Sequence, residues 1–323
     1  MNDSATNLRS LLPLERCDSS DAVPTYADYC REERNFAAIL YAQLLRPEGL
    51  QAFLRRIHGI GPIDHPEQAE VFFEYAHARD LWHRFGRQFD GKGQAGKAQR
   101  EEGFRRAILA LIDAPPGLQE ITKTIAEFNH FFMGRGSKRE IQMPNQWDQR
   151  RFGTWVGLAL DQGWYAQRAE ALRFAERICC LKWAFNAKAD IVIHLPEQRA
   201  VCVEIKVASG ESKYSAKHGD DDAAAAFSMA QTELQRYVLE SLLGYRAHFV
   251  FLTPGGGSGA VDADVAPEAQ AAAESDGANL QTLGWAEVLQ DLHADTSKPP
   301  ELPFVHRMLD SSALQPKKRR GRA

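Results

Sequence analysis

The sequence predicts an α/β protein in which a helical N-terminal region precedes a compact core of strands and helices. Three observations lead to this prediction. The hydrophobic pattern changes from helical to strand periodicity near residue 176. Short β-like runs separated by polar breaks follow, and then a long helical pattern and a further apolar run. The composition, 44% hydrophobic and 25% charged over 323 residues, is that of a globular protein.

The N-terminal elements are expected to be helical. Residues 1–24 read as a flexible leader, and residues 28–45 then form an amphipathic pattern with apolar side chains at four-residue steps: Phe36, Leu40 and Leu44. Further helical patterns cover residues 48–57, 66–85, 100–113 and 117–132. The whole of residues 25–146 is therefore predicted to be a mainly helical region.

The predicted core spans residues 147–253. It begins with a helix near 148–161, and three strand-like runs follow at 177–185, 189–195 and 199–207. A helical pattern at 223–243 and the apolar strand AHFVFLT complete it. Residues 254–293 read as a flexible loop and a helix at 283–292, and residues 294–323 as a basic, disordered tail.

Charge and cysteine content narrow the class of protein. The formal net charge is −4, and the last eight residues hold five basic side chains, so the rest of the chain has a net charge of −9. This negative net charge argues against a protein that coats DNA. It is compatible with an enzyme that contacts nucleic acid in one groove. Five cysteines without CxxC spacing indicate reduced thiols. With no apolar run of membrane-spanning length and no secretory signal, we expect a cytoplasmic protein without a membrane partner.

A predicted hairpin carries the residues of most chemical interest. Residues 189–195 and 199–207 are strand patterns around the turn 196–198. In the second strand, Glu204 and Lys206 share one face by the two-residue period, opposite the face of the valines. Asp190 opens the partner strand, and the hairpin could bring it near Glu204. Burying these charges is costly unless other groups satisfy them.

Two carboxylates and one ammonium suit metal-assisted hydrolysis of a phosphodiester. Carboxylate oxygens are the ligands that Mg²⁺ prefers, and a lysine beside the ion can orient the attacking water or stabilise the transition state. The alternative is an exposed hairpin with an ordinary salt bridge.

These residues resemble the core of the PD-(D/E)xK nuclease superfamily. Asp190 is followed by thirteen residues and then by Glu204-Ile205-Lys206, while Ala189 stands where the family name has proline. The helix text AQTELQRYVLESLL resembles a family helix that carries a glutamine and an Arg-Tyr pair. Gln231 and Gln235 could each be that glutamine, because Glu233 stands three residues before Arg236. The resemblance covers about residues 148–253.

The resemblance implies a fold, a metal and a set of ligands. The fold would be a restriction-endonuclease-like core, with a mixed sheet of about four strands flanked by helices. The cofactor would be Mg²⁺, with Mn²⁺ as a substitute, held by Asp190, Glu204, the Ile205 carbonyl and an acidic residue of the first helix. Glu33 fits that last place better than Glu32, although a solvated helix charge explains it equally well. Lys206 would be catalytic beside Asp190 and Glu204.

The expected function is hydrolysis of DNA, with RNA as the other candidate substrate. Bacterial members of the family often act in restriction or phage defence and often need a partner protein, for which the insert at 56–146 offers a place. A second hypothesis is a catalytically silent subunit of the same fold that binds nucleic acid or acts as a scaffold. The presence of all three residues, Asp190, Glu204 and Lys206, argues against this second hypothesis. A third is an unrelated α/β protein with a surface salt bridge.

Overall fold

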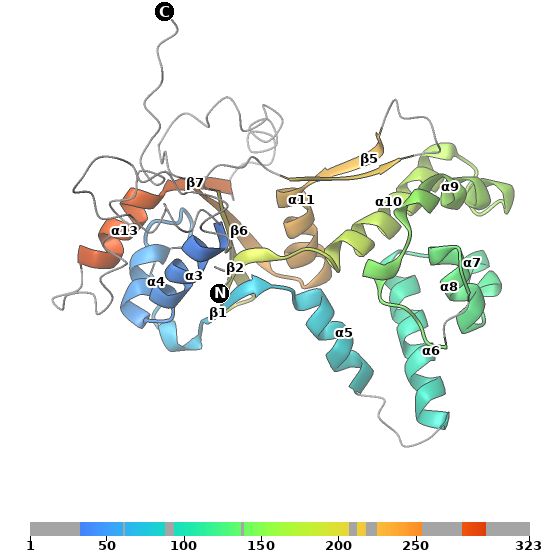
Figure 1. Ribbon diagram of the computed structural model, residues 1–323, viewed down its shortest axis with the longest axis horizontal. Helices are drawn as coiled ribbons and strands as arrows, with labels where there is room; N and C mark the ends of the chain where they lie inside the picture. The colour runs from blue at the N-terminus through green and yellow to red at the C-terminus, as the bar shows by residue number, and fades with distance from the viewer. Residues whose placement is uncertain are drawn as a thin grey trace, which may run out of the picture.

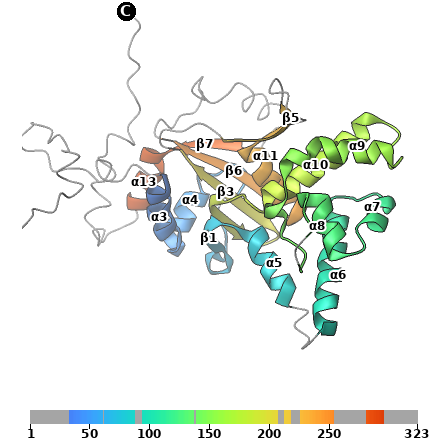
Figure 2. The same cartoon turned by 45° about the vertical axis from the view of Figure 1, so that its right-hand side comes forward.

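The chain folds into a sheet lobe and a helical lobe, with α10 (Arg168–Ala184) and α11 (Gln231–Arg236) between them (Figure 1). The turned view in Figure 2 keeps the same separation of the sheet from helices α6 to α9. The computed structural model describes residues 33–60, 62–87, 94–136, 139–206, 212–217, 225–253 and 280–294.

A mixed sheet forms the centre of the first lobe. In the described chain its strand order is β1-β2-β3-β6-β7, with antiparallel pairing from β1 to β3 and parallel pairing of β3 with β6 and of β6 with β7. The bounds are β1 Glu70–Tyr75, β2 Ala189–Leu195, β3 Arg199–Ile205, β6 Arg246–Thr253 and β7 Leu280–Gly284. The prediction of an α/β fold with a mixed sheet flanked by helices is confirmed, with five strands where about four were expected.

Helices cover both faces of this sheet. One face packs against α3 (Glu33–Leu44), α4 (Pro47–Leu54) and α13 (Trp285–Ala294), with the short helix η1 (Pro66–Gln68) after α4. The other face packs against α11 and the π-helix η4 (Tyr237–Leu242), where Leu239 lies in one cluster with Val192 and Cys202. The sheet is therefore buried on both sides, which explains the nearly continuous apolar runs of β2 and β6.

The β2–β3 hairpin is the predicted one. Ile191 pairs with Val203, and residues 196–198 form the turn. Val201, Val203 and Ile205 are buried on the α3 side, whereas Cys202 lies on the α11 side. The two-residue alternation expected from the sequence is thus confirmed for the described residues of this strand.

The second lobe is helical. Its helices are α5 (His77–Arg87), α6 (Gln94–Leu111), α7 (Pro116–Ile121), α8 (Ile125–Met133) and α9 (Phe152–Asp161), with the short helices η2 (Pro144–Gln146) and η3 (Gln149–Arg151). Phe128, Trp155 and Phe174 are buried in a core that continues to the hairpin of β4 (Lys213–Lys217) and β5 (Ala225–Ala230). This second core is therefore shared between the helices and the segment that follows β3.

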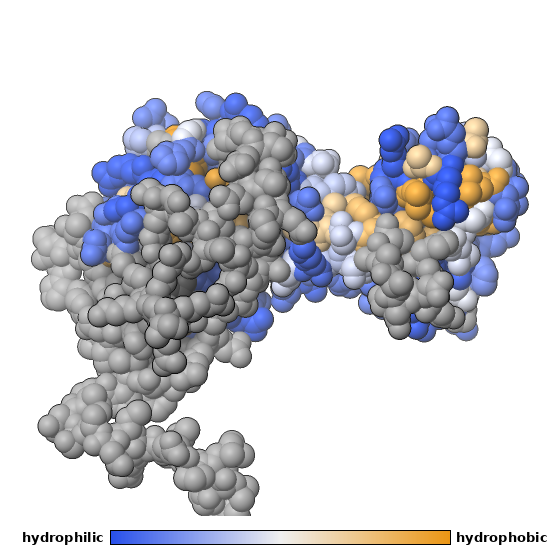
Figure 3. All heavy atoms as spheres, turned by 90° about the horizontal axis from the view of Figure 1, so that it is seen from above, coloured by the Kyte–Doolittle hydropathy of each residue, from blue (hydrophilic) through white to orange (hydrophobic). Residues whose placement is uncertain are grey.

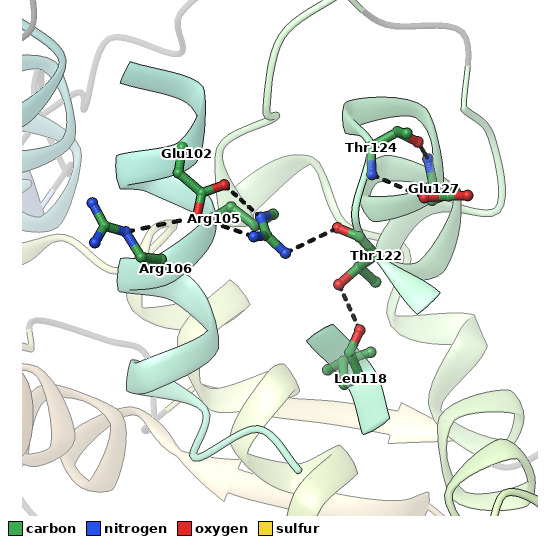
Figure 4. Close-up of polar contacts among 7 residues, drawn as sticks. All are labelled: Glu102, Arg105, Arg106, Leu118, Thr122, Thr124 and Glu127. Atoms are coloured by element: carbon green, nitrogen blue, oxygen red, sulfur yellow. Dashed lines mark hydrogen bonds and ion pairs between the residues drawn. The ribbon is translucent and has the colours of Figure 1, made fainter. Parts of the chain in front are cut away.

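Polar contacts link α6 to the end of α7 and cap the start of α8 (Figure 4). Arg105 of α6 donates to Glu102 on its own helix and to the Thr122 carbonyl after α7. Thr124 and Glu127 form a reciprocal capping box at the start of α8, which satisfies two backbone N–H groups that the helix itself leaves unpaired.

Residues 177–185 are predicted as a strand, but residues 177–184 belong to helix α10 and Phe185 is its C-cap. Residues 178–181 are all buried, so this part of the helix has no polar side to reveal a helical period. A continuous apolar run does not distinguish a strand from a helix that is buried all round. The adjacent Cys179 and Cys180 are buried side chains of this helix, as expected of core residues.

Four strands lie in segments predicted otherwise. β1 falls within the helical pattern at 66–85 and β5 within that at 223–243. β4 falls between the predicted elements, and β7 overlaps the start of the helix predicted at 283–292. Each of them forms only by pairing with a partner strand, and pairing is not visible in a local pattern. β1 and β7 also extend the sheet beyond the interval 147–253.

Several predictions concern residues outside the described part of the chain. These are the leader at 1–24, the loop at 254–279, the tail at 295–323 and Val207 at the end of the predicted second strand.

Surface character differs between parts of the molecule. Apolar residues are visible on the upper side of the helical lobe and across the narrower connection between the lobes (Figure 3). None of the helices within the described residues has the length and apolar character that crossing a membrane requires.

Replacing Phe36 with alanine tests the packing of α3 on the sheet. The Phe36 ring is fully buried with its centroid 6.0 Å from that of Trp285 in α13. Loss of the ring should lower the free energy of unfolding by about 3–5 kcal/mol, measured by urea denaturation. Leu45→Ala is the control, because Leu45 is 56% exposed and should change stability by only about 0.5 kcal/mol. Equal losses in both variants would contradict the packing described.

Candidate functional site

Asp190 and Glu204 lie side by side on neighbouring strands. The β2–β3 register, in which Ile191 pairs with Val203, places Asp190 opposite Glu204. One carboxylate oxygen of Asp190, Oδ2, accepts the backbone N–H of Ile205 at 2.8 Å. This hydrogen bond holds the Asp190 side chain against the end of β3, on the strand that carries Glu204.

The Glu204 carboxylate is buried, with 5% of the residue exposed, and it receives several donors. The Lys206 ammonium lies 2.9 Å from Oε1, and the Gln231 amide donates to the same oxygen. Gln235 donates to Oε2 at 2.7 Å. These contacts supply the hydrogen bonds that a buried carboxylate requires.

Helix α11 presents the two glutamines. It begins where Glu233 accepts the backbone N–H of Ala230 and where the Gln231 N–H donates to the Ser212 carbonyl. Gln231 and Gln235 are four residues apart and therefore share a face of the helix. The Cys202 thiol donates to the Gln235 oxygen across 3.3 Å, which leaves the amide N–H₂ of Gln235 directed at Glu204.

Burial and the two neighbouring negative charges govern the protonation of this site. Burial, and then the charge of Glu204, raises the pKa of Asp190 from 3.8 to about 7. Burial acts to lower the pKa of Lys206, but the charge of Glu204 and its hydrogen bond outweigh this, so the pKa is raised. The folded protein thus favours a proton on Asp190 and a charged Lys206 near neutral pH.

Glu33 stands close enough to act on the same groups. It is the first residue of α3, which packs against β1, β2 and β3. Its charge contributes to the raised pKa of both Asp190 and Lys206. The other candidate, Glu32, lies outside the described residues.

The side-chain oxygen donors that the structure places side by side are the carboxylates of Asp190 and Glu204. Within the described residues, no three side chains of the types His, Cys, Asp or Glu are grouped so that they could hold a metal ion. The Ile205 side chain is buried on the α3 side, and its N–H is the donor to Asp190. The structure therefore brings together Asp190, Glu204 and Lys206, with Glu33 near enough to influence their charges.

The structure also shows residues that the sequence left open or missed. Gln231 and Gln235 were alternatives for one place, and both contact Glu204, while Glu233 caps the helix instead. Tyr214 of β4 was not considered. Burial, and then the charge of Glu204, raises the pKa of its phenol, which places it beside the site. No signal marked Tyr214, because β4 is recognisable only from its pairing with β5.

A scan of protein-family models, a search of curated proteins and a search of solved structures each return no match for this chain. The fold and the site define an α/β protein with a buried carboxylate–lysine cluster at the end of a central strand. Its function is therefore inferred from the geometry of that cluster.

Replacing Asp190 with asparagine should stabilise the metal-free protein at high pH. The folded protein holds a proton on Asp190 up to about pH 7, whereas the unfolded chain releases it near 3.8. Wild-type stability therefore falls as the pH rises between these values. Asparagine keeps an oxygen for the Ile205 N–H and carries no charge. The variant should be more stable by on the order of 2–4 kcal/mol near pH 8 and no more stable near pH 3.

Urea denaturation in EDTA at the two pH values measures this difference. A variant that is less stable than wild type near pH 8 would show that Asp190 is not destabilised by its surroundings.

Replacing Gln235 with leucine should lower the free energy of unfolding by about 1–3 kcal/mol, because Oε2 of the buried Glu204 loses its donor. Gln231→Leu is the matched control. It should cost less, because Oε1 keeps the Lys206 ammonium. Chemical denaturation of both variants measures the two costs. A larger loss in Gln231→Leu would overturn this ranking.

Proposed function

We propose that the protein is a metal-dependent nuclease that hydrolyses phosphodiester bonds, with DNA as its substrate. The observation that carries the proposal is the convergence of Asp190, Glu204 and Lys206 at one end of the β2–β3 hairpin. The combination matches the chemistry of phosphodiester hydrolysis, in which negative charge grows on the phosphoryl oxygens.

The chemistry of the two carboxylates supports binding of a divalent cation. Both are oxygen donors, the kind of ligand that Mg²⁺ and Mn²⁺ take. Among the described residues, the second oxygen of Asp190 receives no hydrogen bond, so it is available to a ligand. Burial, and then the charge of Glu204, raises the pKa of Asp190, and a bound cation would relieve both effects. When bound, the ion would neutralise phosphoryl charge and lower the pKa of a bound water.

In this proposal Asp190 and Glu204 hold the ion and Glu33 adds negative charge from α3. Lys206 keeps its proton, so its role is electrostatic, through stabilisation of negative charge near the carboxylates. The Ile205 N–H orients Asp190, and Gln231 and Gln235 orient Glu204. The proposal also includes a role in phage defence and a partner protein. These two parts rest only on the resemblance to the PD-(D/E)xK nuclease superfamily.

A specific observation favours a second candidate, the catalytically silent subunit. Both oxygens of Glu204 already have donors, and Lys206 is paired with one of them. A network closed in this way can be purely structural.

Replacing Lys206 with alanine separates the two candidates. If Lys206 stabilises the transition state, cleavage of plasmid DNA should fall by ~10²-fold or more while DNA binding is nearly unchanged. The assay compares Mg²⁺, Mn²⁺ and EDTA. Lys123→Ala is the control, because Lys123 is an exposed lysine that pairs with Glu120 in the helical lobe and should cut like wild type.

Two results would count against the nuclease. Equal cleavage by wild type and Lys206→Ala would place the active site elsewhere. Absence of cleavage of both DNA and RNA by the wild type would favour the silent subunit.

A further inference from the structure

A second charged cluster lies at the opposite end of β3 from the candidate site. Arg199, the first residue of β3, pairs in register with Arg246, the first residue of the parallel strand β6. Like charges directly opposite each other on a sheet destabilise it. The register puts both arginine side chains on the same face of the sheet, where their like charges repel and a bound anion would offset the repulsion.

The charges around this pair leave it positive. The Arg199 Nε donates to the Pro196 carbonyl at 3.3 Å, which leaves its terminal N–H groups without a described hydrogen bond, and its carboxylate neighbour Glu197, at 3.9 Å, is 75% exposed and contributes little. Within the described part of the chain, no hydrogen bond or ion pair reaches the Arg246 guanidinium. Its backbone N–H, by contrast, donates to the Gln198 carbonyl at 2.8 Å. The backbone of Arg246 is thus hydrogen-bonded to the turn, whereas its guanidinium has no partner among the described residues.

A tight turn lies beside the pair. Glu197 and Gln198, in the turn just before Arg199, have φ angles of 62° and 54°. Two consecutive residues in the left-handed region are the geometry that tight β-hairpin turns favour. The turn brings Arg199 into register with Arg246 and ties itself to β6 through Gln198.

A histidine extends the cluster on the same face. His248 follows Arg246 by two residues and pairs in register with Val201. Gly59, after α4, has a φ of 78°, and a Cβ there would lie 3.3 Å from the His248 ring. Burial, and then the charges of Arg199 and Arg246, lowers the pKa of His248. The lowered pKa agrees with a positive potential over this end of the sheet.

We infer that Arg199 and Arg246 form a binding site for a phosphate group, separate from the Asp190–Glu204–Lys206 site. Adjacent strands are about 4.8 Å apart, so one phosphate can receive N–H groups from both guanidiniums, each of which has paired donors suited to phosphate oxygens. The two sites lie at opposite ends of β3 and on opposite faces of the sheet. The phosphate can belong to a small molecule or to a nucleic-acid backbone, which present the same oxygens.

The test uses the full chain in EDTA, so that it does not depend on the proposed metal site. Titration calorimetry with inorganic phosphate and with a short DNA duplex measures binding to wild type, Arg246→Ala and Arg106→Ala. Arg106 is an exposed arginine paired with Glu102 on α6 and serves as the control. Arg246→Ala should weaken binding of one or both probes by roughly tenfold or more, and Arg106→Ala should not.

Thermal melting gives a second readout. Without phosphate, Arg246→Ala should melt at a higher temperature than wild type, because the repulsion with Arg199 is removed. Added phosphate should raise the melting temperature of wild type and Lys206→Ala but not of Arg246→Ala.

The two calorimetric probes identify the source of the phosphate. If Arg246→Ala no longer binds inorganic phosphate, the site takes a small molecule. If Arg246→Ala loses only DNA binding, the site contacts a nucleic-acid backbone. Unchanged binding of both probes in Arg246→Ala would overturn the inference.

Discussion

The buried carboxylate of Glu204 is the constraint on which the arrangement of this molecule depends. A carboxylate at the end of a central strand is unfavourable unless donors surround it. Lys206 comes from the same strand, but the two glutamine amides come from α11. Helix α11 must therefore stand against the end of β3. Because α11 also contributes Leu234 to the core of the helical lobe, the site lies where the two lobes meet.

The same contacts hold the two carboxylates in fixed positions. Hydrogen bonds from β3 and α11 orient Asp190 and Glu204, so in the proposed nuclease little reorganisation would be needed for a cation to bind. Burial, and then the neighbouring charge of Glu204, makes ionised Asp190 unfavourable, as its raised pKa indicates. At the other end of β3, two positively charged residues, Arg199 and Arg246, pair in register.

Features that depend on residues close in sequence could be predicted, whereas features that depend on contacts between distant segments could not. The hairpin of β2 and β3 could be predicted because its two strands are adjacent in sequence and its side chains alternate. β1 could not, since its aromatic run also fits a helix and its partner β2 is distant in sequence. Helix α10 was mistaken for a strand because residues buried on every side leave no period to read.

The sequence by itself determined which residues share the candidate site's strand face. Glu204 and Lys206 are two residues apart in a strand, and a short turn returns the chain so that Asp190 comes opposite Glu204. The tertiary structure decided the rest. Both Gln231 and Gln235 bind Glu204, and Glu33 comes near, only because α11 and α3 pack at that end of the sheet. Those positions depend on contacts between distant segments, which a local pattern of residues does not encode.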